Sequence, residues 1–567
     1  MTCEPVSLYR QTLAKRQRQY DYAIATDEYT PFLYPWDSLP ALYLLLAIAI
    51  TPKIPPRPAR AARYIAFVSV LCHGVYVVRH RRTLWLAAGY GIGLMIAWGV
   101  IMSGALLLCN DVRRDFRRLE KRAVKTESAD SDPAKLTATS SQPDPTQDVG
   151  MTKRRMPSSY PFSGTKQSFP RSKKPQPPSQ PYKLVWEGYP YNSGWYHVLD
   201  WTLDLMTSFR AVGWEHRIST VGRIDPSAQR DTPEKVSATG GSSDESQASS
   251  TISQYSRSPQ LRALRGFITN YLLLDFLKTV MVTDPYFLGI APLESRTPWR
   301  WLARLDDAVP IATRFFRLGI TMFGVVSALS LIFSLSPLFF ATILPALVDV
   351  TKITKAPLLE LWMYPVYWQP LSTSVMSSGL AGLWGKCWHQ MFRFGISEPS
   401  RVLIERLNLD ARVDVARVVR LLVAFTLSGS IHASASYTTF SLNGSHPFSG
   451  PLLFFFLQGI GILLQSFIVK LLHRNAPWVK DLPSAVGQTV NVLFVVSYLY
   501  FTGPLLANDF ANSGVWLFEP VPISLFRGIG LGPGGKDEGW WVWNQEGSRS
   551  MGWWMGDRWW ERALAIY

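Results

Sequence analysis

Two histidines in apolar surroundings, His389 and His432, are the residues of this chain best suited to acid–base chemistry. An ionisable side chain within an apolar helix is costly, so each needs a structural or a functional reason. A neutral imidazole is a good base near pH 7, and it can take the proton of a hydroxyl whose oxygen attacks a carbonyl. The alternative interpretation of either residue is a core histidine that is hydrogen-bonded across helices.

Small, polar and aromatic residues accompany both histidines at helical spacing. In LWGKCWHQMFR (383–393), residues four apart would share one stripe of a helix, and two tryptophans would form the neighbouring stripe. In LSGSIHASASY (427–437), small polar residues lie four positions on either side of the histidine. The stripes are Gly385, His389 and Arg393, then Trp384 and Trp388, and finally Ser428, His432 and Ser436. This pattern predicts an internal polar cavity.

Several other kinds of catalytic site are poorly supported. No Gly-x-Ser-x-Gly element accompanies the histidines, which argues against a serine hydrolase. No His-Glu-x-x-His element or carboxylate cluster indicates a metal site, so no metal is expected. Cys387 lies two residues before His389, a spacing that would turn the two side chains to different helix faces. The four cysteines include no Cys-x-x-Cys pair and do not indicate a disulfide framework.

The elements that must position these histidines are apolar helices. Hydrophobic residues make up 47% and charged residues 17% of the 567 residues, and the apolar residues are clustered. About nine stretches approach the roughly 20 apolar residues that a helix needs to cross a bilayer. They lie near 36–50, 64–78, 84–108, 266–282, 311–334, 336–350, 418–437, 451–473 and 485–507. The sequence therefore predicts an all-α, polytopic membrane bundle of about 8–9 transmembrane helices.

Two polar regions and a tryptophan-rich tail divide the chain. Residues 123–183 and 225–260 are rich in Ser, Thr, Pro and Gln, so we expect them to be disordered loops. The basic residues that precede the first loop place it in the cytosol by the positive-inside rule, and we expect the second loop there too. The predicted organisation is a set of N-terminal helices over 1–122, a core over 184–510 that contains the second loop, and an interfacial tail over 511–567.

The net charge of +17 is explained by basic loops that face anionic lipid. Basic residues flank apolar segments and no nucleic-acid motif is present, so a nucleic-acid partner is not expected. The polar N-terminus does not resemble a cleavable signal peptide. We expect a multi-pass protein of the endoplasmic reticulum membrane, with its oligomeric state left open. Asn443-Gly-Ser445 matches a glycosylation sequon.

The two histidine segments resemble the two signatures of the fungal wax-synthase-like branch of membrane-bound O-acyltransferases. Three further segments resemble elements of the same family in the family's order. They are FRAVGWEHR (209–217), YLLLDFLKTVMVTDPYF (271–287) and PLLFFFLQGIGILLQ (451–465). The sequence departs from the family pattern at Ala211 and Gln465, where a glycine and an acid are common.

The resemblance implies a role for each of these residues. His432 would be the catalytic base, and His389 would hold the acyl donor or the oxyanion, at a place where related enzymes often carry Asn. The substrate-binding residues would be Trp384, Gly385, Trp388, Arg393, Ser428 and Gln458. For Gln458, an interhelical hydrogen bond is the alternative interpretation. Arg210 would meet a coenzyme A phosphate from the cytosol, with a lipid headgroup as the alternative.

The resemblance also implies the substrates. The fungal proteins of this branch are often acetyltransferases of secondary metabolism, which implies acetyl-CoA as co-substrate, a terpenoid or meroterpenoid alcohol as acceptor and no permanently bound cofactor. Long-chain acyl transfer to a fatty alcohol or sterol is the second hypothesis. A membrane transporter is the third, because prolines interrupt several apolar stretches, although it leaves both histidine segments unexplained.

Overall fold

The computed structural model describes most of the chain. The described residues are 5–84, 86–123, 182–221, 259–441, 444–532, 534–543, 551–556, 558 and 561–567. Most of the two predicted loops, and the sequon residue Asn443, lie outside these residues, so the expectations about them stay predictions.

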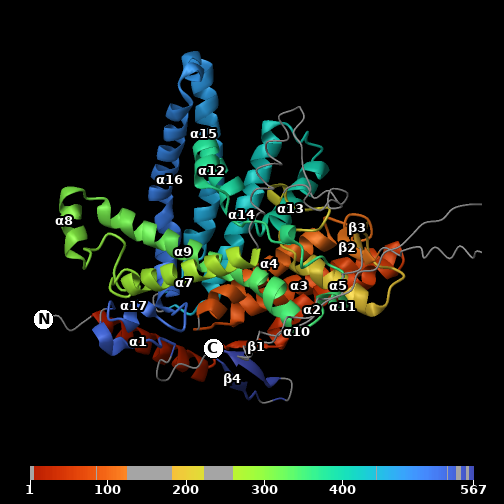
Figure 1. The fold of residues 1–567 in the computed structure, drawn as a ribbon, viewed down its shortest axis with the longest axis horizontal. Coiled ribbons are helices and arrows are strands. Elements are labelled where there is room, and N and C mark those ends of the chain that lie inside the picture. Colours follow the sequence, from red (N-terminus) through yellow and green to blue (C-terminus); the bar gives the residue numbers. More distant parts are fainter. Residues whose placement is uncertain are drawn as a thin grey trace, which may run out of the picture.

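Helices form most of the described structure (Figure 1). In chain order they are α1 (Pro5–Ala25), α2 (Leu39–Ile50), α3 (Pro56–His80), α4 (Leu86–Leu107), α5 (Trp195–Thr207), α7 (Pro259–Met281), α8 (Arg300–Ala308), α9 (Ala312–Leu338), α10 (Leu344–Leu347), α11 (Val350–Ile353), α12 (Leu371–Gly382), α13 (Arg393–Arg406), α14 (Asp414–Thr438), α15 (Leu453–Asn475), α16 (Ser484–Ser513) and α17 (Leu525–Gly528). Figure 1 shows α15 and α16 as a projecting hairpin, with α1 and the C-terminus on the opposite side.

Six of the described helical segments are long and apolar enough to cross a bilayer. They are Pro56–His80, Gly89–Leu107, Ala312–Leu347, Asp414–Thr438, Phe448–Asn475 and Ser484–Ser513. The stretches 311–334 and 336–350 form one segment, because α9 continues past Pro337 and a π-helical turn then joins α9 to α10. The stretch 36–50 becomes the 12-residue α2, and 266–282 lies in α7, which carries four charged residues. The predicted helical membrane bundle is confirmed, with fewer candidate spans in the described residues than expected.

Two small sheets, which the sequence did not predict, connect distant parts of the chain. β1 (Phe32–Tyr34) pairs with β5 (Ala563–Ile566), which also pairs with β4 (Met551–Trp554), all antiparallel. β2 (Arg118–Ala123) and β3 (Tyr182–Glu187) form an antiparallel pair. The first sheet therefore joins the N-terminal region to the C-terminal tail.

The tail is only partly the interfacial anchor that its tryptophans suggested. Trp540, Trp541 and Trp553 are exposed, as expected of an anchor, but Trp516 is only 8% exposed. A buried ionic cluster holds this part of the tail to the helices. Glu519 accepts hydrogen bonds from Arg527 and from Tyr9 of α1, and it lies 3.9 Å from Lys278 of α7.

Close packing of α4 against α14 positions the helix that carries His432. A Cβ at Gly93 would overlap the carbonyl oxygen of Ser434, so only glycine allows this approach. One turn away, the hydroxyl of Thr438 donates to the carbonyl of Gly89 at 2.7 Å. Two glycines spaced by four residues thus fix how α4 lies along α14.

Candidate active site

His389 lies in a loop and not on the helical stripe that its spacing predicted. Helix α12 is followed by a π-helical turn over Leu383–Cys387, the backbone is extended at Trp388, and α13 begins only at Arg393. Gly379 has a φ of 57°, and the amide of Gln465 fills the place where its Cβ would lie. The prediction of one continuous helix over 383–393 is therefore wrong, because this backbone departs from regular helical geometry.

Hydrogen bonds between neighbouring residues hold the loop in place. The guanidinium of Arg393 donates to the carbonyl of Gly385 at 2.9 Å and to the amide oxygen of Gln390 at 3.0 Å. The Gln390 amide in turn donates to the carbonyls of Trp384 and Trp388. Gly385 and Arg393 are thus brought together, but as supports of the loop. Their predicted contact with substrate stays a prediction.

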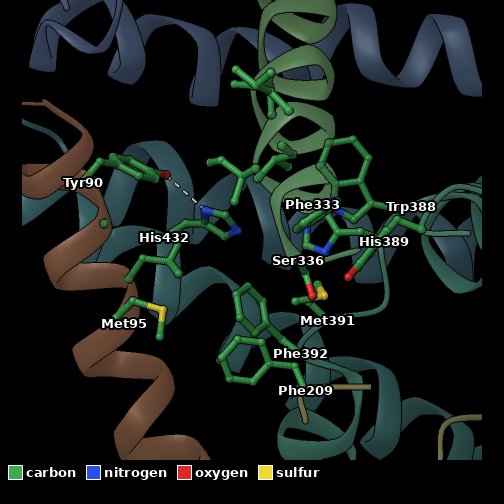
Figure 2. Close-up of a pocket in the computed structure, with 18 of the residues that line it drawn as sticks. Tyr90, Met95, Phe209, Phe333, Ser336, Trp388, His389, Met391, Phe392 and His432 are labelled. Atoms are coloured by element: carbon green, nitrogen blue, oxygen red, sulfur yellow. Dashed lines mark hydrogen bonds between the residues drawn. The ribbon is translucent and has the colours of Figure 1, made fainter. Parts of the chain in front are cut away.

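A large cavity joins the two histidines. Its volume is about 1410 Å³, and its walls come from α4, α5, α7, α9, α14, α15, α16 and the segments between them. Five of the predicted site residues line it, namely Arg210, Trp384, Trp388, His389 and His432. Figure 2 shows His432 and His389 on facing sides of part of this cavity, with Phe333 beside His389 and with Phe209 and Phe392 on a common wall. Apolar side chains dominate the remaining wall.

The imidazole of His432 is fixed on two sides. Its Nδ1 lies 3.1 Å from the hydroxyl of Tyr90 on α4. Its ring stacks on Phe455 of α15, with the centroids 4.4 Å apart and the planes 11° apart. In Figure 2 the other ring nitrogen points away from Tyr90, toward the side of the cavity that holds His389. The ring therefore presents Nε2 to the cavity.

His389 lies in an aromatic environment. Its ring contacts those of Phe333, Trp368, Trp388 and Phe392, and its Nδ1 is buried with no hydrogen-bond partner among the described residues. Burial lowers the pKa of His389 to about 3, and the nearby His432 and Arg210 lower it further in the same direction. The ring is therefore neutral at physiological pH, with one N–H to donate.

Two other predicted residues act as supports in this structure. Gln458 accepts a hydrogen bond from the indole N–H of Trp384 and donates to the hydroxyl of Thr502 on α16, which is the interhelical alternative. Arg210 donates to the carbonyls of Pro365 and Val366, and its guanidinium lies 4.0 Å from the ring centroid of Tyr367. Ser428 is half-buried on α14, one turn before His432.

Tyr90 is a hydrogen-bonding partner of His432 that the sequence reasoning missed. It lies 342 residues before the histidine, in a stretch predicted only as a membrane span. A signal was present, because Tyr90 lies within Gly89-Tyr-Gly-Ile-Gly93, a small-residue spacing that marks close helix contacts in membranes. That spacing indicates a helix contact, but it does not identify the partner helix.

The comparisons with known proteins point to this same region. Residues 368–457 match the family model described as "Membrane bound O-acyl transferase family". This segment of the chain is therefore similar to that family. The matched residues run from just before α12 into α15, and they contain both His389 and His432.

Three curated fungal relatives are similar over a limited region. "Acetyltransferase fsoF" of Humicola fuscoatra is 28% identical over 145 residues, which are 24% of this chain and 34% of that protein. "Acetyltransferase aurG" of Calcarisporium arbuscula is 26% identical over 163 residues, 27% of this chain and 38% of that protein. "O-Mevalon transferase yanI" of Aspergillus niger is 28% identical over 144 residues, 22% and 32% of the two chains. The chain spans about a third of the length of the curated relatives it matches. No solved structure matches.

Proposed function

We propose that this protein is a membrane O-acyltransferase that transfers the acetyl group of acetyl-CoA to a hydroxyl of a terpenoid or meroterpenoid, with His432 as the general base. One observation carries the proposal. His432 has one ring nitrogen engaged by Tyr90 and presents the other to a cavity of about 1410 Å³ that it shares with His389. Both histidines belong to the segment that matches the acyltransferase family.

The proposed reaction uses Nε2 of His432, the ring nitrogen that faces the cavity. Nε2 of His432 takes the proton of the acceptor hydroxyl while its oxygen attacks the thioester carbonyl carbon. The C–S bond of the tetrahedral intermediate then breaks, and the proton on Nε2 passes to the departing thiolate. The products are an acetate ester and free coenzyme A. The atoms and electrons of this reaction balance without a metal ion or a redox partner.

The developing oxyanion needs a hydrogen-bond donor across the cavity from the base. His389 is neutral at physiological pH and lines the same cavity, so its ring can supply one N–H. Trp388 lies beside it, with its ring centroid 5.3 Å from that of His389, and also lines the cavity. We assign these two side chains to the carbonyl oxygen of the acyl donor.

The walls of the cavity suit an apolar acceptor that arrives through the lipid. Aliphatic and aromatic side chains from α4, α9 and α16 dominate the lining, and the volume accommodates a polycyclic skeleton beside the thioester. The relatives named as acetyltransferases support acetyl as the group transferred. For Arg210, contact with coenzyme A is the least supported assignment, because two backbone carbonyls and Tyr367 already bind its guanidinium.

Expression in a heterologous host tests the proposal. Microsomes that contain the protein are incubated with radiolabelled acetyl-CoA and with farnesol, geranylgeraniol or ergosterol, in parallel with labelled palmitoyl-CoA. We expect labelled acetate ester and a mass gain of one acetyl group on a terpenoid alcohol. Ester from palmitoyl-CoA alone would favour long-chain transfer, and uptake of an alcohol without any ester would favour a transporter. Imaging of a tagged chain tests the proposed location in the endoplasmic reticulum.

A further inference from the structure

We infer that Tyr90 is a positioning residue for the base. Its phenolic oxygen accepts the Nδ1–H of His432 and so leaves the lone pair of Nε2 in the cavity. The inference rests on the proposed function, and it assigns a role to a residue far outside the matched segment 368–457. Its basis is the 3.1 Å contact between the Tyr90 hydroxyl and Nδ1 of His432.

The fold holds the two side chains together from both helices. Gly89 and Gly93, on either side of Tyr90, let α4 approach α14 so closely that a Cβ at Gly93 would overlap the Ser434 carbonyl. The hydroxyl of Thr438 donates to the carbonyl of Gly89, which fixes the register of the two helices. Tyr90 faces His432 because it lies between these two contacts along α4.

Aromatic packing restrains both rings. The ring of Tyr90 meets Phe510 of α16 edge-on, with the centroids 5.5 Å apart. On the far side, His432 stacks on Phe455. The imidazole is therefore held with Nδ1 toward the phenol and Nε2 toward the cavity. A flip of the ring would break the hydrogen bond to Tyr90 and would turn Nε2 away from the cavity.

The chemistry of the base requires an acceptor at this position. When His432 takes the proton of the alcohol, both of its ring nitrogens carry a hydrogen, and both then donate. Nδ1–H must therefore donate to an oxygen while the imidazolium exists, and the Tyr90 hydroxyl is the oxygen within reach. A tyrosine that donated to Nδ1 instead would leave the hydrogen on Nε2, and His432 could not act as the base from that tautomer.

Substitution of Tyr90 by Phe in the full-length chain removes only the hydroxyl. With labelled acetyl-CoA and the best acceptor among farnesol, geranylgeraniol and ergosterol, we expect kcat to fall roughly tenfold to a hundredfold, because a hydrogen bond to a charged group is lost. The KM values for both substrates should stay within about twofold, since the cavity keeps its shape. In a His432→Gln background, Y90F should cause no further loss, because the two residues act as one unit.

A second tyrosine–histidine pair provides the matched control. The hydroxyl of Tyr43 lies 3.3 Å from Nδ1 of His73, between α2 and α3 and away from the large cavity, so Y43F should keep the wild-type kcat. A Gly93→Ala variant keeps the Tyr90 hydroxyl but pushes α4, and Tyr90 with it, away from α14. It should therefore reproduce the kcat loss of Y90F. Gly99→Ala on the same helix meets no atom within 4 Å and should not.

The outcomes separate the two claims. A Y90F enzyme with an unchanged or higher kcat, or one whose loss adds to that of His432→Gln, overturns the role of Tyr90 and leaves the acyltransferase proposal standing. A wild-type protein that forms no ester overturns the proposed function, and the inference falls with it.

Discussion

The indole N–H of Trp384 donates to the amide oxygen of Gln458 at 3.2 Å, and this contact links the cavity wall to the helices behind it. Gln458 is fully buried on α15, and its amide nitrogen donates onward to the hydroxyl of Thr502 on α16 at 3.1 Å. The side chain of Gln458 therefore joins its own helix, α15, to two other elements, the π-helical turn that carries Trp384 and α16. The orientation of Trp384 in the cavity depends on a residue behind the wall.

Replacement of Gln458 by Leu should weaken both stability and catalysis. The change leaves the Trp384 N–H without its acceptor, and a buried polar group in that state costs about 1–3 kcal/mol. We expect a lower midpoint of thermal unfolding in detergent and a raised KM for the acceptor, since Trp384 lines the cavity.

Gln465→Leu is the matched control for that prediction. Gln465 lies two turns further along α15, accepts from the backbone N–H of Leu380 and donates to Asn491, and neither partner lines the cavity. Its loss should lower the unfolding midpoint and leave the KM unchanged. Equal changes of KM in the two variants would contradict the link between Gln458 and the site.

The proposed donor role of His389 predicts which substitutions the site tolerates. His389→Ala removes the N–H and should lower kcat by about 10²–10³-fold, the loss observed when one oxyanion donor is removed. His389→Asn keeps a donor at this position and should retain activity within about tenfold of the wild type. An Ala variant as active as the Asn variant would remove His389 from the mechanism.

His389 also predicts how stability depends on pH. Burial lowers its pKa from the ordinary 6.5 to about 3, so between these values the unfolded chain binds a proton that the folded chain does not. The neutral ring makes its full contribution to the free energy of unfolding above about pH 6.5, and this contribution is lost as the pH falls toward 3. Between pH 7.5 and pH 5.5, the unfolding midpoint should fall more for the wild type than for His389→Asn. Identical shifts would contradict this assignment.

The buried pair of Arg317 and Asp284 should be essential for stability. Both side chains are fully buried, and two hydrogen bonds of 2.8 Å join the guanidinium to the carboxylate. Asp284→Ala leaves the buried guanidinium without an opposite charge, with only backbone carbonyls as acceptors, and should cost about 3–5 kcal/mol. The double variant D284A with Arg317→Met should recover part of that loss, measured by thermal unfolding. Lys470→Ala, which breaks an exposed ion pair with Asp414, should change little.

The sequence predicted those parts of the site that depend on local pattern. The apolar stretch 418–437 indicated the helix of His432, and the structure has α14 over Asp414–Thr438. The small residues around His432 also predicted an internal polar cavity beside it. A cavity is present there, but apolar side chains dominate its walls. Both features follow from the composition and spacing of one short segment. They could therefore be predicted without knowledge of the tertiary structure.

The parts that the sequence missed depend on contacts between distant residues. The π-helical turn and the loop around His389 follow Gly379, whose backbone has a positive φ. The amide of Gln465, on another helix, occupies the space that a Cβ at Gly379 would need. The contact between Tyr90 and His432 joins residues 342 positions apart, and no periodicity reports such a pair. Trp516 is buried by Phe287 and Phe510, whereas the tryptophan content of the tail suggested only an interface.

The most direct measurement is the rate of ester formation by the His432→Gln variant. Its matched control is His73→Gln, because Nδ1 of His73 also lies near a tyrosine hydroxyl. We expect the rate of labelled acetate ester formation in microsomes to fall by about 10²–10⁴-fold for His432→Gln, because a general base contributes that much, and to stay at the wild-type level for His73→Gln. A His432→Gln protein that folds and esterifies the acceptor at the wild-type rate would contradict the assignment of His432 as the base.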